Sequence, residues 1–166
     1  MTVMTGLGPG RSVNEVTKNT LPPPNVVPEY VRGAHFYVCL WLDYAFKQPV
    51  DPRVTEQEIN RLAALQNSLS DIPGVPEAWT IEKVIVERRA PGVIAGKAGL
   101  SRGKRQWVLE EQDRILTAIH RRGYTVYDRS LHNLMTDGDT VTMIDFYDIY
   151  RHGQQTRAWE GAWSEE

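Results

Sequence analysis

Three oxygen-bearing side chains between residues 128 and 145 form a pattern that suits metal and phosphate chemistry. Asp128 precedes Asn133 by five residues, and Asp145 directly follows the short apolar run at 141–144. Mg²⁺ takes oxygen ligands in near-octahedral geometry and usually binds through one or two carboxylates plus substrate phosphates. Asn133 and Asp145 are therefore the expected metal ligands, and Asp128 is suited to orient a hydroxyl group or accept its proton.

A β-hairpin is the element that would bring two of these side chains together. The turn sequence Thr136-Asp137-Gly138-Asp139 separates Leu134-Met135 from an alternating, β-branched run at 140–144. Such a turn between two short apolar runs is typical of paired antiparallel strands. Residues 133 and 145 would then leave the two strands at the same open end.

A long helix is expected to lead into this region. Between residues 104 and 122 apolar residues recur at helical spacing, and Gly123 follows as a stop signal. The residues of this stripe are Val108, Ile115, Leu116 and Ile119. Helix, loop, hairpin and terminal aspartate thus follow one another in order. The alternative is that Asp128 and Asn133 only cap loop backbone, as such residues often do.

This order of elements resembles the catalytic segment of the protein-kinase-like superfamily, including its aminoglycoside-phosphotransferase branch. The residues that carry the resemblance are the helix end Ile119-His120-Arg121-Arg122-Gly123, the spacing from Asp128 to Asn133, and Asp145-Phe146. The resemblance implies ATP and Mg²⁺ as cofactors. It also implies transfer of the terminal phosphoryl group to a hydroxyl acceptor, with a protein as the expected substrate or partner.

Several positions depart from the protein-kinase pattern. Val126 and Tyr127 stand where protein kinases carry His and Arg, and Tyr147 stands where they carry Gly after Asp-Phe. Only 21 residues follow Asp145, so we expect a truncated helical lobe without a full activation segment. His132 in the loop has two interpretations, either a basic group near the transferred phosphoryl group or a histidine with no chemical role.

The resemblance also implies how the amino-terminal half is built. It predicts an α+β, protein-kinase-like two-lobed fold in a single domain, with an N-lobe over about 1–89 and a truncated C-lobe over about 90–166. The N-lobe would be a five-stranded antiparallel sheet with one helix. The segments expected to supply it are an apolar-aromatic strand or hairpin at 35–46, a helix at 55–69, and strands near 80–81 and 83–87.

The implied nucleotide-binding positions are spread over this half. Gly8 and Gly10 resemble a shortened glycine-rich phosphate loop, although the same segment equally fits a leader. Lys47 resembles the phosphate-binding lysine of a kinase strand, and the alternative is a solvated lysine at a strand end. Glu87 and Ala90 belong to the segment whose backbone would hold the adenine.

Glu58 has two competing roles. In the resemblance, a glutamate on this helix pairs with the strand lysine and helps to position the nucleotide. Thr55-Glu56-Gln57-Glu58 is also a capping box, in which the Glu58 carboxylate accepts a hydrogen bond from the Thr55 backbone N–H. Capping is the better supported single role. The short spacing from Lys47 to Glu58 also leaves open that the lysine is missing and that Cys39 or Leu40 stands in its place.

Composition narrows the possible classes of protein, partner and compartment. A chain of 166 residues with 41% hydrophobic residues can fold one domain with a substantial core. The net charge of −2 gives no general attraction for nucleic acid. No stretch suits an export signal or a membrane span.

Cys39 is the only cysteine, so we expect a buried thiol and a cytoplasmic or other intracellular reducing compartment. Trp159 and Trp163 would cover the truncated lobe or anchor a partner.

Three functions are compatible with these observations. The first is a minimal kinase-like phosphotransferase that uses Mg²⁺ and ATP. The second is a pseudokinase-like protein-binding module, which keeps a nucleotide cradle but has little or no catalysis. The third treats the carboxylates as turn residues of an unrelated partner-binding α/β domain.

Overall fold

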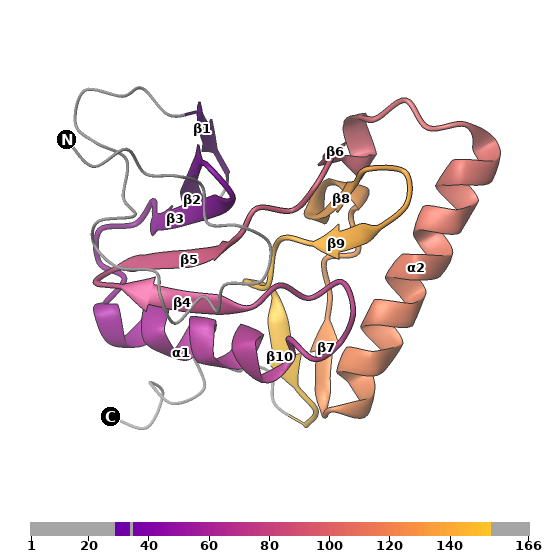
Figure 1. Ribbon diagram of the computed structural model, residues 1–166. Helices are drawn as coiled ribbons and strands as arrows, with labels where there is room; N and C mark the ends of the chain where they lie inside the picture. The colour runs from indigo at the N-terminus through magenta and orange to yellow at the C-terminus, as the bar shows by residue number, and fades with distance from the viewer. Residues whose placement is uncertain (1–28, 34, 154–166) are drawn as a thin grey trace. The chain divides into compact units, whose positions relative to one another are not determined.

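The computed structural model of the protein describes residues 29–33 and 35–153 (Figure 1). Within these residues the chain forms two compact units. The first extends to residue 63 and includes residues 77–89, and the second consists of residues 64–76 and the residues from 90 onward. The described part is a mixed α+β structure with an antiparallel amino-terminal sheet and two α-helices. This confirms the α+β class. Gly8, Gly10, Trp159 and Trp163 lie outside the described residues.

The first unit is built on a five-stranded antiparallel sheet with the order β1-β2-β3-β5-β4. Its strands are β1 (Glu29–Arg32), β2 (Phe36–Trp41), β3 (Tyr44–Pro49), β4 (Ala78–Ile81) and β5 (Val84–Arg88). The predicted five-stranded sheet is therefore confirmed, and the run at 35–46 proves to be a hairpin, whereas β1 was not among the segments predicted to supply it. The turn between β2 and β3 holds Leu42 at a positive φ of 52°, which L side chains rarely adopt.

The strand register sorts the side chains of this sheet onto two faces. One face carries a buried apolar cluster of Cys39, Tyr44, Phe46 and Val86, which confirms the expected burial of the thiol. The other face carries Thr80, whose hydroxyl donates to Oδ1 of Asn60 at 2.6 Å. Helix α1 (Glu56–Ser68) therefore lies on this second face, and the boundary between the two units falls within the helix.

The second unit contains α2 (Arg102–Arg121) and two small antiparallel sheets. One sheet has the order β6-β8-β9, and the other pairs β10 with β7. The strands are β6 (Val93–Ile94), β7 (Tyr124–Val126), β8 (Leu134–Thr136), β9 (Val141–Met143) and β10 (Ile149–Arg151). The β8–β9 hairpin and the α2 helix confirm the corresponding predictions, whereas β6, β7 and β10 were not predicted.

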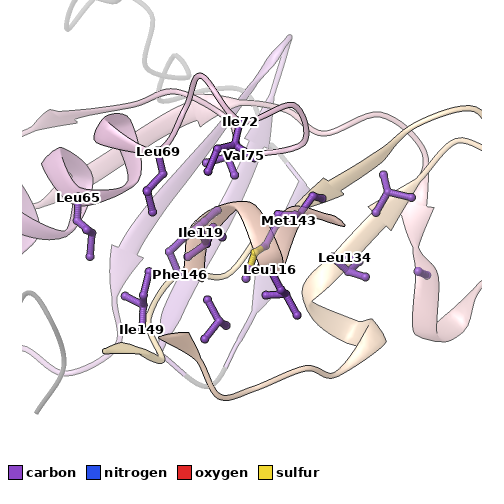
Figure 2. Packing of buried hydrophobic residues seen from close by; sticks show 14 of the residues in the cluster. Leu65, Leu69, Ile72, Val75, Leu116, Ile119, Leu134, Met143, Phe146 and Ile149 are labelled. Atoms are coloured by element: carbon purple, nitrogen blue, oxygen red, sulfur yellow. The ribbon is translucent and has the colours of Figure 1, made fainter. Parts of the chain in front are cut away.

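The core of the second unit lies between α2, the hairpin and the segment that follows α1 (Figure 2). The predicted stripe of α2 is buried, and Val108 and Ile119 are fully excluded from solvent. Leu134 and Met143 from the hairpin, and Phe146 just after it, pack into the same cluster. The ends of β8 and β9 are therefore anchored directly on this core.

Two glycines allow the backbone to approach the hairpin closely. Gly92 has a φ of +88°, and a Cβ atom there would lie 2.0 Å from the Thr136 carbonyl oxygen. Gly74 has a φ of +98°, and its carbonyl accepts a hydrogen bond from the Met143 N–H at 2.8 Å. Both positions require a residue without a side chain.

None of the helices in the described residues is long and apolar enough to cross a membrane.

Candidate functional site

Asn133 and Asp145 lie just outside the two strands at the open end of the hairpin. Leu134 pairs with Met143 in the β8–β9 ladder. The Ile144 N–H donates to the Asn133 carbonyl at 2.9 Å, so the pairing extends one step beyond the strands. Asn133 and Asp145 are both half-buried at this end. The structure therefore brings together the two residues that the sequence predicts as metal ligands.

Oxygen atoms of both residues remain available for a ligand. Asp145 Oδ1 accepts the Tyr147 N–H at 2.9 Å. Its Oδ2 atom and the Asn133 side-chain amide have no hydrogen-bond partner among the described residues. This donor set, one carboxylate oxygen and one amide oxygen, suits Mg²⁺, which completes its shell with water and phosphate oxygens. The described residues contain no group of three or more His, Cys, Asp or Glu side chains arranged for a metal, so other ligands would have to complete the shell.

Asp128 lies on the exposed loop that connects β7 with the hairpin. Its Oδ1 atom accepts the Ser130 N–H at 3.0 Å, and Ser130 caps the short 3₁₀ helix η4 (Leu131–Asn133). The buried Gln112 of α2 donates from Nε2 to the Arg129 carbonyl at 2.9 Å. The loop that carries Asp128 is thus held to α2 through Arg129 and to the start of η4 through Ser130.

Gln112 positions this loop but was not among the residues predicted from the sequence. A signal was present, because Gln112 falls on the same helical stripe as Val108, Ile115 and Ile119. A polar residue on a buried stripe must find a hydrogen-bond partner, since burying an unsatisfied amide is costly.

The His132 ring packs over Gly96 in the 3₁₀ helix η3 (Ala95–Lys97). A Cβ atom at Gly96 would lie 2.7 Å from the His132 ring. The ring Nδ1 atom lies 3.3 Å from Ser130 Oγ. These contacts favour the interpretation of His132 as a loop histidine with no chemical role.

Lys47 lies inside strand β3 and not at its end. It is 8% exposed, so the alternative of a solvated lysine is wrong. Its Nζ atom lies 2.6 Å from Oε1 of Glu87, which is 2% exposed. Since Ala45 pairs with Glu87 and Lys47 pairs with Ile85, both charged side chains fall on one face of the sheet. This ion pair was not predicted from the sequence, because it depends on the register between β3 and β5.

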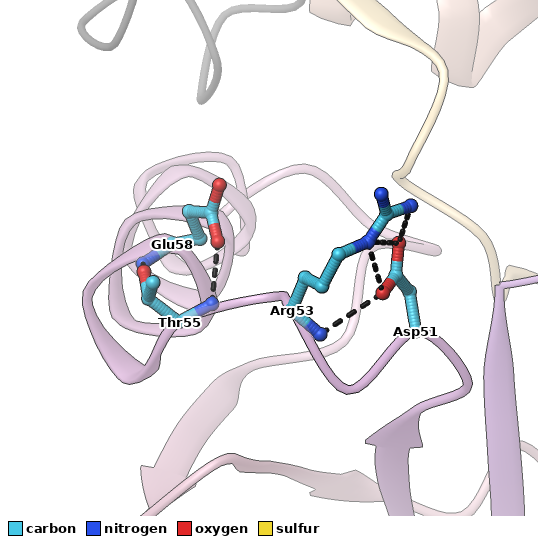
Figure 3. Close-up of polar contacts among 4 residues, drawn as sticks. All are labelled: Asp51, Arg53, Thr55 and Glu58. Carbon is cyan, nitrogen blue, oxygen red and sulfur yellow. Dashed lines mark hydrogen bonds and ion pairs between the residues drawn. The ribbon is translucent and has the colours of Figure 1, made fainter.

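Glu58 caps α1 (Figure 3). Its Oε2 atom accepts the Thr55 N–H at 2.5 Å, and Thr55 Oγ1 accepts the Glu58 N–H at 3.2 Å. This confirms the capping box. The structure therefore pairs Lys47 with Glu87 and leaves Glu58 at the start of the helix.

An exposed ion pair lies just before this helix (Figure 3). The Arg53 guanidinium binds both carboxylate oxygens of Asp51, at 3.0 and 2.9 Å. These hydrogen bonds lower the pKa of Asp51 from 3.8 to about 2.

The two residues predicted to hold adenine differ in their backbone surroundings. Glu87 lies opposite both Ala45 and Ala78, so its backbone belongs to the sheet on either side. Ala90 begins the second unit and is buried, and its backbone has no hydrogen-bond partner among the described residues. Of the two positions, Ala90 is the one with backbone groups left for a ligand.

Comparisons with known proteins find matches among solved structures. No protein-family model matches the chain, and no curated protein matches it. Among solved structures, a co-crystal structure of WbdD with a kinase inhibitor is similar at 19% identity and a TM-score of 0.49, over 72% of this chain and 32% of that chain. A second crystal structure of WbdD has the same identity and TM-score, over 74% and 33%. The chain thus spans about a third of the length of WbdD, and no conclusion about its activity follows from this distant likeness.

Proposed function

We propose that this protein is a minimal kinase-like phosphotransferase, which binds ATP with Mg²⁺ and transfers the terminal phosphoryl group to a hydroxyl acceptor on a protein. The observation that supports this most is the hydrogen bond from the Ile144 N–H to the Asn133 carbonyl. It pairs Asn133 with the residue before Asp145 at the open end of the hairpin. The motif order from Asp128 to Asp145 supports the same proposal.

The residues have distinct roles in this proposal. Asn133 and Asp145 hold Mg²⁺, which neutralises charge on the phosphates when it is bound. Asp128 orients the acceptor hydroxyl and receives its proton. The remaining residues bind the nucleotide. The Ala90 backbone contacts the adenine, and Lys47, Gly8 and Gly10 contact the phosphates. Catalysis at such a site is mainly positioning and electrostatic stabilisation.

The second candidate is a pseudokinase-like protein-binding module. The observation that favours it is the buried ion pair of Lys47 with Glu87. An amine that already has a buried counter-charge stabilises the fold without any ligand. A phosphate would have to compete with Glu87 for it. In this candidate the nucleotide supports the fold, and the activity belongs to a partner surface.

A thermal-melt titration with ATP, with and without Mg²⁺, tests the first step. Ligand at about a hundred times Kd stabilises a protein by roughly 2.7 kcal/mol. For a chain of this size that corresponds to a melting shift on the order of 5–10 °C. We expect the Mg²⁺-dependent shift to disappear in Asp145→Asn and to persist in Asp139→Asn, which makes the same charge change at the exposed turn of the same hairpin. An equal shift in both variants would remove Asp145 from the site.

Phosphoryl transfer separates the two candidates. Asp128→Asn should retain the Mg²⁺ATP melting shift and lose transfer of the labelled phosphoryl group to protein acceptors. A wild-type protein that binds Mg²⁺ATP without transferring phosphate would support the pseudokinase-like module. Full transfer by Asp128→Asn would contradict the role of this carboxylate.

A further inference from the structure

A pocket of 280 Å³ opens in the second unit beside the carboxyl-terminal half of α2. In Figure 1, β7 runs next to this part of the helix and β10 pairs with β7. The lining residues come from α2, β7 and the loop that follows β7: Leu116, Thr117, His120, Thr125, Val126 and Arg129. The volume is close to the lower end of small-molecule sites, about 300–1,000 Å³.

The lining combines an apolar base with cationic and hydroxyl groups. Leu116 and Val126 are buried members of the core. Thr117 and Thr125 carry hydroxyls that can donate to a ligand. None of the lining residues is acidic. The Arg129 side chain has no hydrogen-bond or ion-pair partner among the described residues, and a guanidinium matches the geometry of phosphate oxygens.

His120 is held by a second histidine. Its Nδ1 atom lies 3.0 Å from Nε2 of His152, and the ring centroids are 4.2 Å apart. His152 is itself fixed by its N–H, which donates to the Gly123 carbonyl at 2.9 Å. When His152 Nε2–H donates to His120 Nδ1, a neutral His120 carries its proton on Nε2. An anion bound at Nε2 would favour that tautomer, so His152 is a positioning residue for His120.

We propose that this pocket binds a small phosphate monoester with an apolar group. The phosphate is held by Arg129, His120 and the threonine hydroxyls, and the apolar group rests on Leu116 and Val126. The proposal goes beyond the phosphotransferase function, because Asp128, Asn133 and Asp145 do not line the pocket.

Titration with phenyl phosphate, followed by the backbone amide signals of the full chain in NMR spectra, tests this site. We expect saturable shifts at millimolar ligand that concentrate on the lining residues. Arg129→Gln should weaken binding by about 10- to 100-fold, the effect of losing a charge-assisted hydrogen bond. Arg105→Gln, the same charge change at an exposed position near the start of α2, should bind like wild type.

A second variant tests the pocket without changing charge. Thr125→Val keeps a β-branched side chain in strand β7 and replaces the hydroxyl with a methyl group, so the amide spectrum should otherwise be preserved. We expect it to weaken binding by about 2- to 10-fold. Unchanged binding by both Thr125→Val and Arg129→Gln would overturn the proposal.

Competing ligands show which part of the probe is recognised. Benzoate that binds as tightly as phenyl phosphate would overturn the assignment to phosphate, and inorganic phosphate that binds as tightly would overturn the apolar subsite. Equal weakening of binding by Arg105→Gln and Arg129→Gln would mean that general charge attraction holds the ligand, and this outcome would also overturn the proposal. Asp145→Asn should bind phenyl phosphate normally, so this proposal and the nucleotide site can fail separately.

Discussion

The two units hold their charged residues in opposite ways. In the first unit, Lys47 and Glu87 are buried between neighbouring strands and neutralise each other at 2.6 Å. In the second, Asp128 and Asp145 lie on loop backbone, and each carboxylate accepts one N–H from two residues further along the chain. In the first unit each charge is matched by the other, whereas in the second unit carboxylate oxygens are left for a ligand.

The difference follows from where each group lies. A charge inside a sheet loses its hydration and must have a counter-charge in place, so its geometry is fixed by the register of the strands. A carboxylate on a loop keeps access to water and needs only a local N–H to set its orientation. Stability should therefore depend strongly on the first pair and weakly on the loop carboxylates, which are suited to binding.

Breaking the buried pair should cause the largest loss of stability. Lys47→Met leaves the Glu87 carboxylate buried without its counter-charge, and we expect the free energy of unfolding to fall by about 3–5 kcal/mol. Chemical denaturation measures this. Lys83→Met removes the same charge from an exposed turn and should change stability by less than about 0.5 kcal/mol. A similar small loss in both variants would show that the pair does not stabilise the sheet.

Crowding of the backbone next to the hairpin should cause the second-largest loss of stability. In Gly92→Ala the new Cβ meets the Thr136 carbonyl, and overpacking of this kind costs about 1–3 kcal/mol. Gly99→Ala is the matched control, because Gly99 also has a positive φ, of 59°, but no atom lies within 4 Å of its Cβ position. The difference between the two denaturation curves isolates the crowding at the hairpin. Equal losses would mean that backbone strain accounts for the whole effect.

Asp145 should be more important for binding than for stability. Asp145→Asn keeps an oxygen that can accept the Tyr147 N–H, so we expect its unfolding free energy to stay within about 0.5 kcal/mol of wild type. Asp145→Ala loses that hydrogen bond and should be less stable by about 0.5–1.5 kcal/mol. A thermal melt of the two variants gives the comparison. A large loss in Asp145→Asn would place this residue with the buried pair of the first unit.

The smallest effect on stability is expected for an ion pair that is exposed to solvent. Asp51 and Arg53 form an exposed pair, and the folded pKa of Asp51, about 2, lies below its ordinary 3.8. Because that pKa is lowered by folding, the contribution to stability is complete above pH 3.8 and is lost as the pH falls toward 2. A carboxyl NMR titration should give a midpoint near 2, and Arg53→Gln should move it back toward 3.8. A wild-type midpoint near 3.8 would contradict the pairing.

Elements with local signals could be predicted from the sequence. The apolar stripe of α2 predicts the helix, and the Thr136-Asp137-Gly138-Asp139 turn predicts the hairpin. The capping box from Thr55 to Glu58 does the same for the start of α1. In each case the residues that interact are only a few positions apart, so propensity and periodicity contain the information.

The very short strands were missed for a physical reason. β6, β7 and β10 contain two or three residues each, too few for a visible alternation of side chains. β6 forms because the hairpin strand β8 offers it a partner, and β7 and β10 form by pairing with each other. Tertiary pairing, and not local propensity, makes these segments strands.

The sequence by itself determined the two helices, the hairpin and the end of the hairpin at which Asn133 and Asp145 emerge, because short-range turn and helix signals specify them. Only the tertiary structure decided which charges pair and what holds the loop. The partner of Lys47 is set by the register of β3 against β5, and the tether from Gln112 to Arg129 by the packing of α2. Both contacts join residues far apart in the chain, where local patterns contain no information about distance.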